Sequence, residues 1–93
     1  YPFIKFDLSF SVPVEFSAHL IVDEINKLLS NNENEIEIFD DFQHENSRNL
    51  GIRIVTRSYE KTYDDNETRQ ILMKISDSLE AKFKITLNSG NND

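Results

Sequence analysis

The sequence contains no cysteine and very little glycine or proline. Its 93 residues include two glycines and two prolines, and the lack of cysteine excludes disulfide bonds and thiolate metal sites. A reducing compartment such as the cytoplasm is therefore the expected location. No apolar run is long enough to span a membrane, and no signal-peptide pattern opens the chain. The scarcity of glycine and proline, together with 29% charged residues, argues against a loop-rich or disordered chain.

Size and hydrophobic content predict one domain with a two-layer core. Seven phenylalanines and 38% hydrophobic residues are sufficient for such a core in a chain of this length. The chain opens at Tyr1, directly in strand-like sequence and without a methionine, so we expect it to be one domain of a longer polypeptide. The net charge of −7, taken alone, favours a protein partner over RNA, because free-standing RNA-binding domains are usually basic.

Hydrophobic periodicity predicts the order β-α-β-β-α-β. The expected strands are residues 3–14, 36–42, 49–57 and 83–87. The first helix is expected to begin at an N-cap at Ser17 and to bury Leu20, Ile21, Ile25, Leu28 and Leu29. The second begins at Asp64, which has capping-box spacing to Glu67. Right-handed crossovers then place both helices on one face of a four-stranded antiparallel sheet, which is a ferredoxin-like α+β fold over residues 1–88, followed by a flexible tail at 89–93.

The hairpin formed by the second and third strands holds the candidate site. Ile36 and Ile38 alternate with glutamates, but the next bulky apolar residue, Phe39, is one step out of phase. A bulge at this point would keep Phe39 inside and turn the next alternate residues outward. We therefore expect five residues on the open face of the sheet: Asp40, Phe42, Asn49, Arg53 and Arg57. An acid, an aromatic ring, an amide and two cations are suited to a polar ligand that can stack.

Four segments resemble one known family. The sequence Phe39-Asp40-Asp41-Phe42 is similar to the Phe-Asp-x-Tyr motif of the ferredoxin-fold anticodon-binding domain, which closes the β chain of bacterial phenylalanyl-tRNA synthetase. Residues 7–10 resemble the Asp-Leu-Ser-Phe part of the family's opening, residues 50–58 its third segment, and residues 61–67 the start of its last helix. The resemblance covers nearly the whole chain, in order.

The resemblance implies a tRNA-binding role with no chemistry in this domain. In the family, the motif's aspartate, its aromatic residue and a polar residue at the start of the third strand face the first anticodon base. At the matching positions this sequence has Asp40, Phe42 and Asn49. Arg53 and Arg57 would either neutralise phosphate or pair with nearby acids. The implied partners are the anticodon of tRNA(Phe), the rest of the β chain and the α chain, and the ATP and magnesium of aminoacylation would be used in other domains.

The sequence departs from the family at several positions, and alternatives stay open. Phe42 replaces the usual tyrosine, Asn49 stands where serine is common, and Lys84 occupies the place of a helix-ending glycine, which predicts a left-handed backbone there. No catalytic constellation is present, because the two histidines are far apart and the adjacent Asp40 and Asp41 point to opposite faces of a strand. The alternatives are a protein-interaction module that uses the open face and a small-molecule regulatory domain of similar fold.

Overall fold

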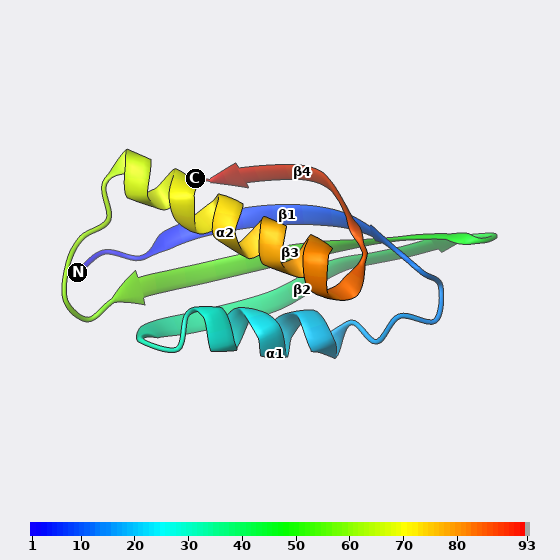
Figure 1. Cartoon of the computed structure of the whole chain (residues 1–93), viewed down its shortest axis with the longest axis horizontal. Coiled ribbons are helices and arrows are strands. Elements are labelled where there is room, and N and C mark those ends of the chain that lie inside the picture. The colour runs from blue at the N-terminus through cyan, green and yellow to red at the C-terminus, as the bar shows by residue number, and fades with distance from the viewer. Residues whose placement is uncertain (93) are drawn as a thin grey trace.

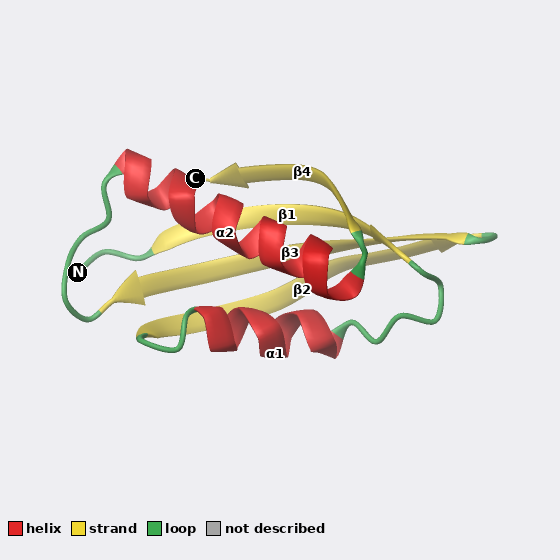
Figure 2. Ribbon diagram, in the orientation of Figure 1, coloured by secondary structure: helices red, strands yellow, loops and turns green. Residues whose placement is uncertain are grey.

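The computed structural model describes residues 1–92, which form a four-stranded antiparallel sheet with two helices. The elements are β1 (Ile4–Val12), α1 (His19–Leu28), β2 (Asn32–His44), β3 (Ser47–Ser58), α2 (Asp65–Phe83) and β4 (Thr86–Asn92). The strand order is β2-β3-β1-β4. Both helices lie on the same side of the sheet, and the β2–β3 hairpin extends past them at one end (Figures 1 and 2). The predicted ferredoxin-like fold is confirmed.

The core lies between the helices and one face of the two central strands. Alternate residues of β1 and β3 point toward the helices and are almost completely buried: Phe6, Leu8, Phe10, Leu50, Ile52 and Ile54. The helices contribute Ile21, Ile25, Ile75 and Leu79 from the other side. Burying each of these side chains contributes roughly 1.5–3 kcal/mol. Because both helices cover this face of the sheet, the opposite face of the described sheet has no helix over it.

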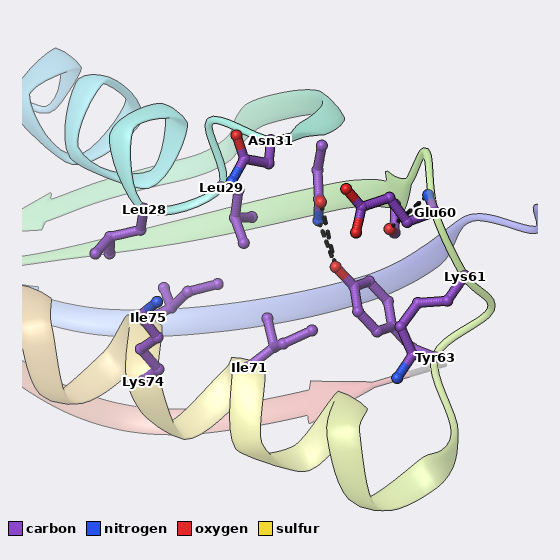
Figure 3. A pocket seen from close by; sticks show the side chains of 11 residues that line it. Leu28, Leu29, Asn31, Glu60, Lys61, Tyr63, Ile71, Lys74 and Ile75 are labelled. Atoms are coloured by element: carbon purple, nitrogen blue, oxygen red, sulfur yellow. Dashed lines mark hydrogen bonds between the residues drawn. The ribbon is translucent and has the colours of Figure 1, made fainter.

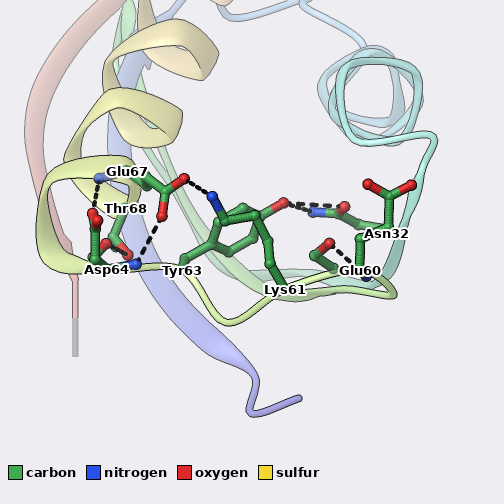
Figure 4. A network of polar contacts seen from close by, with 8 residues as sticks. Asn32, Glu60, Lys61, Tyr63, Asp64, Glu67 and Thr68 are labelled. Carbon is green, nitrogen blue, oxygen red and sulfur yellow. Dashed lines mark hydrogen bonds and ion pairs between the residues drawn. The ribbon is translucent and has the colours of Figure 1, made fainter.

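Local hydrogen bonds fix the beginning and the end of α2. The Asp64 carboxylate accepts from the Glu67 N–H at 2.7 Å, and the Glu67 carboxylate accepts from the Asp64 N–H at 3.1 Å, which confirms the predicted capping box (Figure 4). Just before the capping box, the Asn32 side chain donates to the Tyr63 hydroxyl at 2.9 Å. This bond ties the segment between β3 and α2 to β2. The helix is capped by Lys84, whose N–H donates to the Glu80 carbonyl oxygen at 2.9 Å and whose φ of 56° and ψ of 36° confirm the predicted left-handed conformation.

Two predictions about α1 are wrong. The N-cap is Ala18, whose side chain makes no capping hydrogen bond. Ser17 contributes only its carbonyl oxygen, which accepts a hydrogen bond from the Leu20 N–H at 3.1 Å. The first turn is therefore closed by backbone groups. Leu20 is 38% exposed, because the buried positions Ile21, Ile25 and Leu29 form a narrow stripe with a four-residue repeat and Leu20 falls beside it.

The sheet is longer than its sequence predicts. Residues 32–35, which precede the expected second strand, belong to β2, because β3 continues to Ser58 and provides their ladder partners. Only residues 45 and 46 separate β2 from β3, in place of the expected 43–48, and Glu45 adopts a φ of 55°. The prediction of a flexible tail is wrong for residues 89–92, which pair with β1, whereas Asp93 lies outside the described residues.

Candidate nucleic-acid interface

The structure brings all five predicted site residues onto the helix-free face. Asp40 is paired with Gly51 and Phe42 with Asn49 across the β2–β3 ladder, and directly opposed residues share a face. Arg53 and Arg57 follow on the same side of β3, because Leu50, Ile52 and Ile54 take the alternate positions under the helices. Phe42 is 59% exposed. The predicted outward direction of Asp40 and Phe42 is therefore confirmed.

The predicted burial of Phe39 is wrong, although the bulge itself is present. The β2–β3 register shifts between Ile38 and Asp40, which leaves Phe39 as the extra residue. Its side chain is 44% exposed and lies on the open face, against Gly51 and beneath the Arg53 guanidinium. The space that a Cβ of Gly51 would fill is occupied by this ring, at 2.8 Å from Phe39 Cζ. A glycine in the neighbouring strand thus gives the bulged side chain a place outside the core.

Asn49 is held by a small cluster of uncharged polar groups. Its Oδ1 accepts hydrogen bonds from Ser11 Oγ and from Asn88 Nδ2, both at 3.0 Å. Ser11 comes from β1 and Asn88 from β4, where the β1–β4 register shifts and places an extra residue. Among the residues that the structure describes, Asn49 Nδ2 has no protein acceptor, so it is the group that this side chain can offer to a ligand.

Arg53 forms a bidentate ion pair with Asp7 on β1. The distances are 2.9 Å from Nε to Oδ1 and 3.3 Å from Nη2 to Oδ2, and the guanidinium carbon lies 4.8 Å from the centre of the Phe39 ring. Hydrogen bonds from Arg53 hold the pKa of the Asp7 carboxyl below its ordinary value. The charge of Arg53 is therefore largely compensated within the sheet.

Arg57, farther along β3, also has an acidic and an aromatic neighbour. Its Nη2 lies 3.1 Å from the Glu33 carboxylate on β2, and its guanidinium carbon lies 4.6 Å from the centre of the Phe3 ring. Both arginines thus have acidic neighbours, which was one of the two possibilities left open by the sequence.

The open face carries an excess of negative charge. In the described part of the sheet, five acidic side chains point to this side against three basic ones: Asp7, Glu33, Glu35, Glu37 and Asp40 against Lys5, Arg53 and Arg57. Phosphate contacts normally dominate nucleic-acid affinity. A nucleic acid bound here would therefore depend on its bases rather than on its backbone.

Asp41 lies on the opposite side of the hairpin from Asp40, as predicted. It forms a bidentate pair with Arg48, at 2.9 and 3.0 Å, and this pairing lowers the pKa of Asp41. Arg48 Nη1 also donates to the carbonyl oxygens of Val14 and Phe16, at 2.9 and 2.5 Å. This contact fastens the hairpin to the loop before α1, so Asp41 has a structural role and lies away from the open face.

Several functional neighbours were missed from the sequence. Asp7, Ser11 and Asn88 are not among the predicted site residues, yet Asp7 holds Arg53 and the other two hold Asn49. Asp7 and Ser11 fall on the outward parity of β1, so the alternation of that strand was the available signal. Asn88 gave no such signal, because its place depends on the irregularity in β4.

A cavity of about 310 Å³ lies on the other side of the molecule, between α1, α2 and the connection before α2 (Figure 3). Leu28, Ile71 and Ile75 form its apolar wall, and Tyr63 and Lys61 border it on the connection. It opens on the helix layer and shares no residue with the open face.

Within residues 1–92, no group of histidine and carboxylate side chains has the arrangement of a metal site, and none of the helices is both long and apolar enough to cross a membrane.

Comparisons with known proteins assign the family. Residues 1–88 match the family described as the ferredoxin-fold anticodon binding domain. The phenylalanine–tRNA ligase β subunit of Trichormus variabilis is 32% identical over 96% of this chain, and that of Nitrosospira multiformis is 29% identical over 96%. The chain spans only 12% of the length of either relative. A de novo designed protein, Foldit4, has the same fold, with a TM-score of 0.62, 9% identity and coverage of 98% of this chain and 96% of that one. The chain therefore belongs to the ferredoxin-fold anticodon-binding domain family.

Proposed function

We propose that this chain is the anticodon-binding domain of a phenylalanyl-tRNA synthetase β chain and reads the first anticodon base of tRNA(Phe). The observation that carries the proposal is the gathering of Asp40, Phe42 and Asn49 at one end of the helix-free face. The β-subunit relatives, which match over almost the whole chain, support the choice of parent enzyme.

The three side chains supply complementary contacts to an unstacked guanine. The Asp40 carboxylate accepts from the N1 and N2 donors of the base, which are accessible only when the base is single-stranded. The exposed Phe42 ring stacks on the base, and Asn49 Nδ2 donates to an acceptor on its edge. Arg53 and Arg57 lie farther along the face, and their carboxylate partners reduce their value as phosphate contacts.

The catalytic steps belong elsewhere in the proposed parent enzyme. Aminoacylation with ATP and magnesium takes place in other domains, and the remainder of the β chain and the α chain hold the body of the tRNA. We place the whole assembly in the cytoplasm. This division of labour accounts for an acidic RNA-binding domain, because the phosphate contacts that it lacks are made by its partners.

The proposal is tested by Asp40→Ala in the full synthetase. Loss of a hydrogen bond to a charged group costs roughly 1.5–3 kcal/mol, so the apparent KM for tRNA(Phe) should rise by about 10-fold or more. Amino-acid activation, which needs no tRNA, should be unchanged. Asp77→Ala is the control, because this exposed carboxylate lies on α2, away from the open face. Equal loss in both assays, or equal effects of the two substitutions on KM, would reject the assigned role.

The acidic open face favours one other function, the binding of a basic protein segment. Titrating the 93-residue chain with anticodon stem-loops that carry guanine or adenine at the first position separates the two. Chemical-shift changes at Asp40 and Phe42 that depend on the base support RNA recognition. Identical spectra with both stem-loops favour the protein partner.

A further inference from the structure

The centre of the open face carries a layered arrangement of three side chains. Phe39 lies against the backbone of Gly51, and the Arg53 guanidinium lies over the Phe39 ring at 4.8 Å. Asp7 holds two guanidinium nitrogens from the side, at 2.9 and 3.3 Å. The guanidinium is therefore fixed in position by contacts on one face and along one edge.

This arrangement is poorly suited to a phosphate contact and well suited to stacking. Asp7 occupies the Nε–Nη2 edge of the guanidinium, which is one of its two bidentate edges, and compensates the positive charge that would attract a phosphate. The Arg53 side chain remains 36% exposed. Guanidinium planes are a known stacking surface for unpaired RNA bases. Since its orientation is already fixed by Asp7 and Phe39, little side-chain entropy would be lost on binding a base.

The layered group is one step along β3 from the proposed guanine-reading residues. Asp40 is opposite Gly51, and Arg53 is the next residue on the same face of that strand, a rise of roughly 7 Å at the usual strand spacing. One extended nucleotide step spans such a separation. A base held between Asp40 and Phe42 therefore brings its neighbour to Arg53.

We infer that the Asp7–Arg53–Phe39 group is a second base-stacking platform, which binds the nucleotide adjacent to the one read by Asp40. This inference rests on the proposed function and deepens it. The platform selects for an unstacked base of any identity, because each base has a face that can stack. With the phosphates directed away from an acidic sheet, the contribution of this site to affinity should also vary little with salt.

Arg53→Lys tests the platform, because it keeps the positive charge near Asp7 and removes the plane. Binding to an anticodon stem-loop of tRNA(Phe) is measured with the intact loop and with an abasic nucleotide on either side of the first anticodon position. For the unmodified protein, one of the two abasic loops should bind at least about fivefold more weakly. Arg53→Lys should already bind the intact loop more weakly to that extent, and the same abasic change should cause little further loss of affinity. Arg69→Lys, on the exposed side of α2, is the control and should bind all loops like the unmodified protein.

Three outcomes are decisive. The inference is overturned if Arg53→Lys binds the intact loop as tightly as the unmodified protein, since a phosphate contact would survive this substitution. It is also overturned if both proteins lose the same affinity with each abasic loop. If Asp40→Ala binds the intact loop without any loss, the proposed function itself fails, which separates that result from failure of the platform alone.

Discussion

Adding one methyl group at Gly51 should disrupt the open face without unfolding the domain. A Cβ at this position would lie 2.8 Å from Phe39 Cζ, 3.0 Å from Phe39 Cε2 and 3.1 Å from Asp40 Cβ. The backbone of Gly51 has no positive φ, so an alanine meets no backbone strain. The ring of Phe39 must therefore move. Arg53 then loses the ring beneath its guanidinium, and Asp40 is also displaced.

The expected change in stability is small because two effects nearly cancel. Displacing the ring loses a cation–π contact with Arg53, worth about 0.5–1 kcal/mol at an exposed site. Replacing glycine by alanine inside a strand gains about 0.5–1 kcal/mol in backbone entropy. The free energy of unfolding should then stay within about 1 kcal/mol of its original value, and Tm within about 4–8 °C. Binding should fall roughly 5–150-fold, the equivalent of about 1–3 kcal/mol for one stacked base.

The assay combines thermal unfolding with stem-loop binding, and Gly90→Ala is the matched control. A Cβ at Gly90 would lie 2.9 Å from Leu8 Cδ2, on the helix side, where Leu8 is only 1% exposed. Overpacking there should cost about 1–3 kcal/mol of stability and leave binding unchanged. Full affinity in Gly51→Ala would refute the reasoning, because the ring would then have no part in the site.

The remaining predictions concern the end of α2 and the pH dependence of the sheet. Lys84→Gly should raise the free energy of unfolding by about 1 kcal/mol, because glycine adopts the left-handed backbone without a Cβ penalty; an unchanged midpoint in urea would contradict this. The folded-state pKa of Asp7 is lowered by Arg53, so the pair stabilises the fold above the ordinary carboxyl value of 3.8 and loses that contribution as pH falls through the lowered pKa. The stability difference between the unmodified protein and Asp7→Asn should therefore shrink on acidification below pH 3.8, and a difference that stays constant would exclude the ion pair as its source.

Features encoded by neighbouring residues could be predicted from the sequence. The alternation in β1 and β3 identified the buried face, since successive strand residues point to opposite sides. Asp64 and Glu67 identified the start of α2, because their capping bonds join residues only three apart. Parity in β3 placed Asn49 on the open side, and the phase break at Phe39, interpreted as a bulge, placed Asp40 and Phe42 there. The motif resemblance then gave these three residues a function.

Features that depend on which strands become neighbours could not be predicted. Phe39 lies outside the core because Gly51, across the ladder, leaves room for its ring, and nothing near Phe39 in the sequence shows that space. Arg53 is paired because the sheet places Asp7 opposite it, 46 residues away in the chain. The sequence by itself determined the order of the elements and the face of each strand, through local periodicity and capping. Only the tertiary structure decided which charges are compensated and which rings face solvent, because those outcomes depend on cross-strand contacts between distant segments.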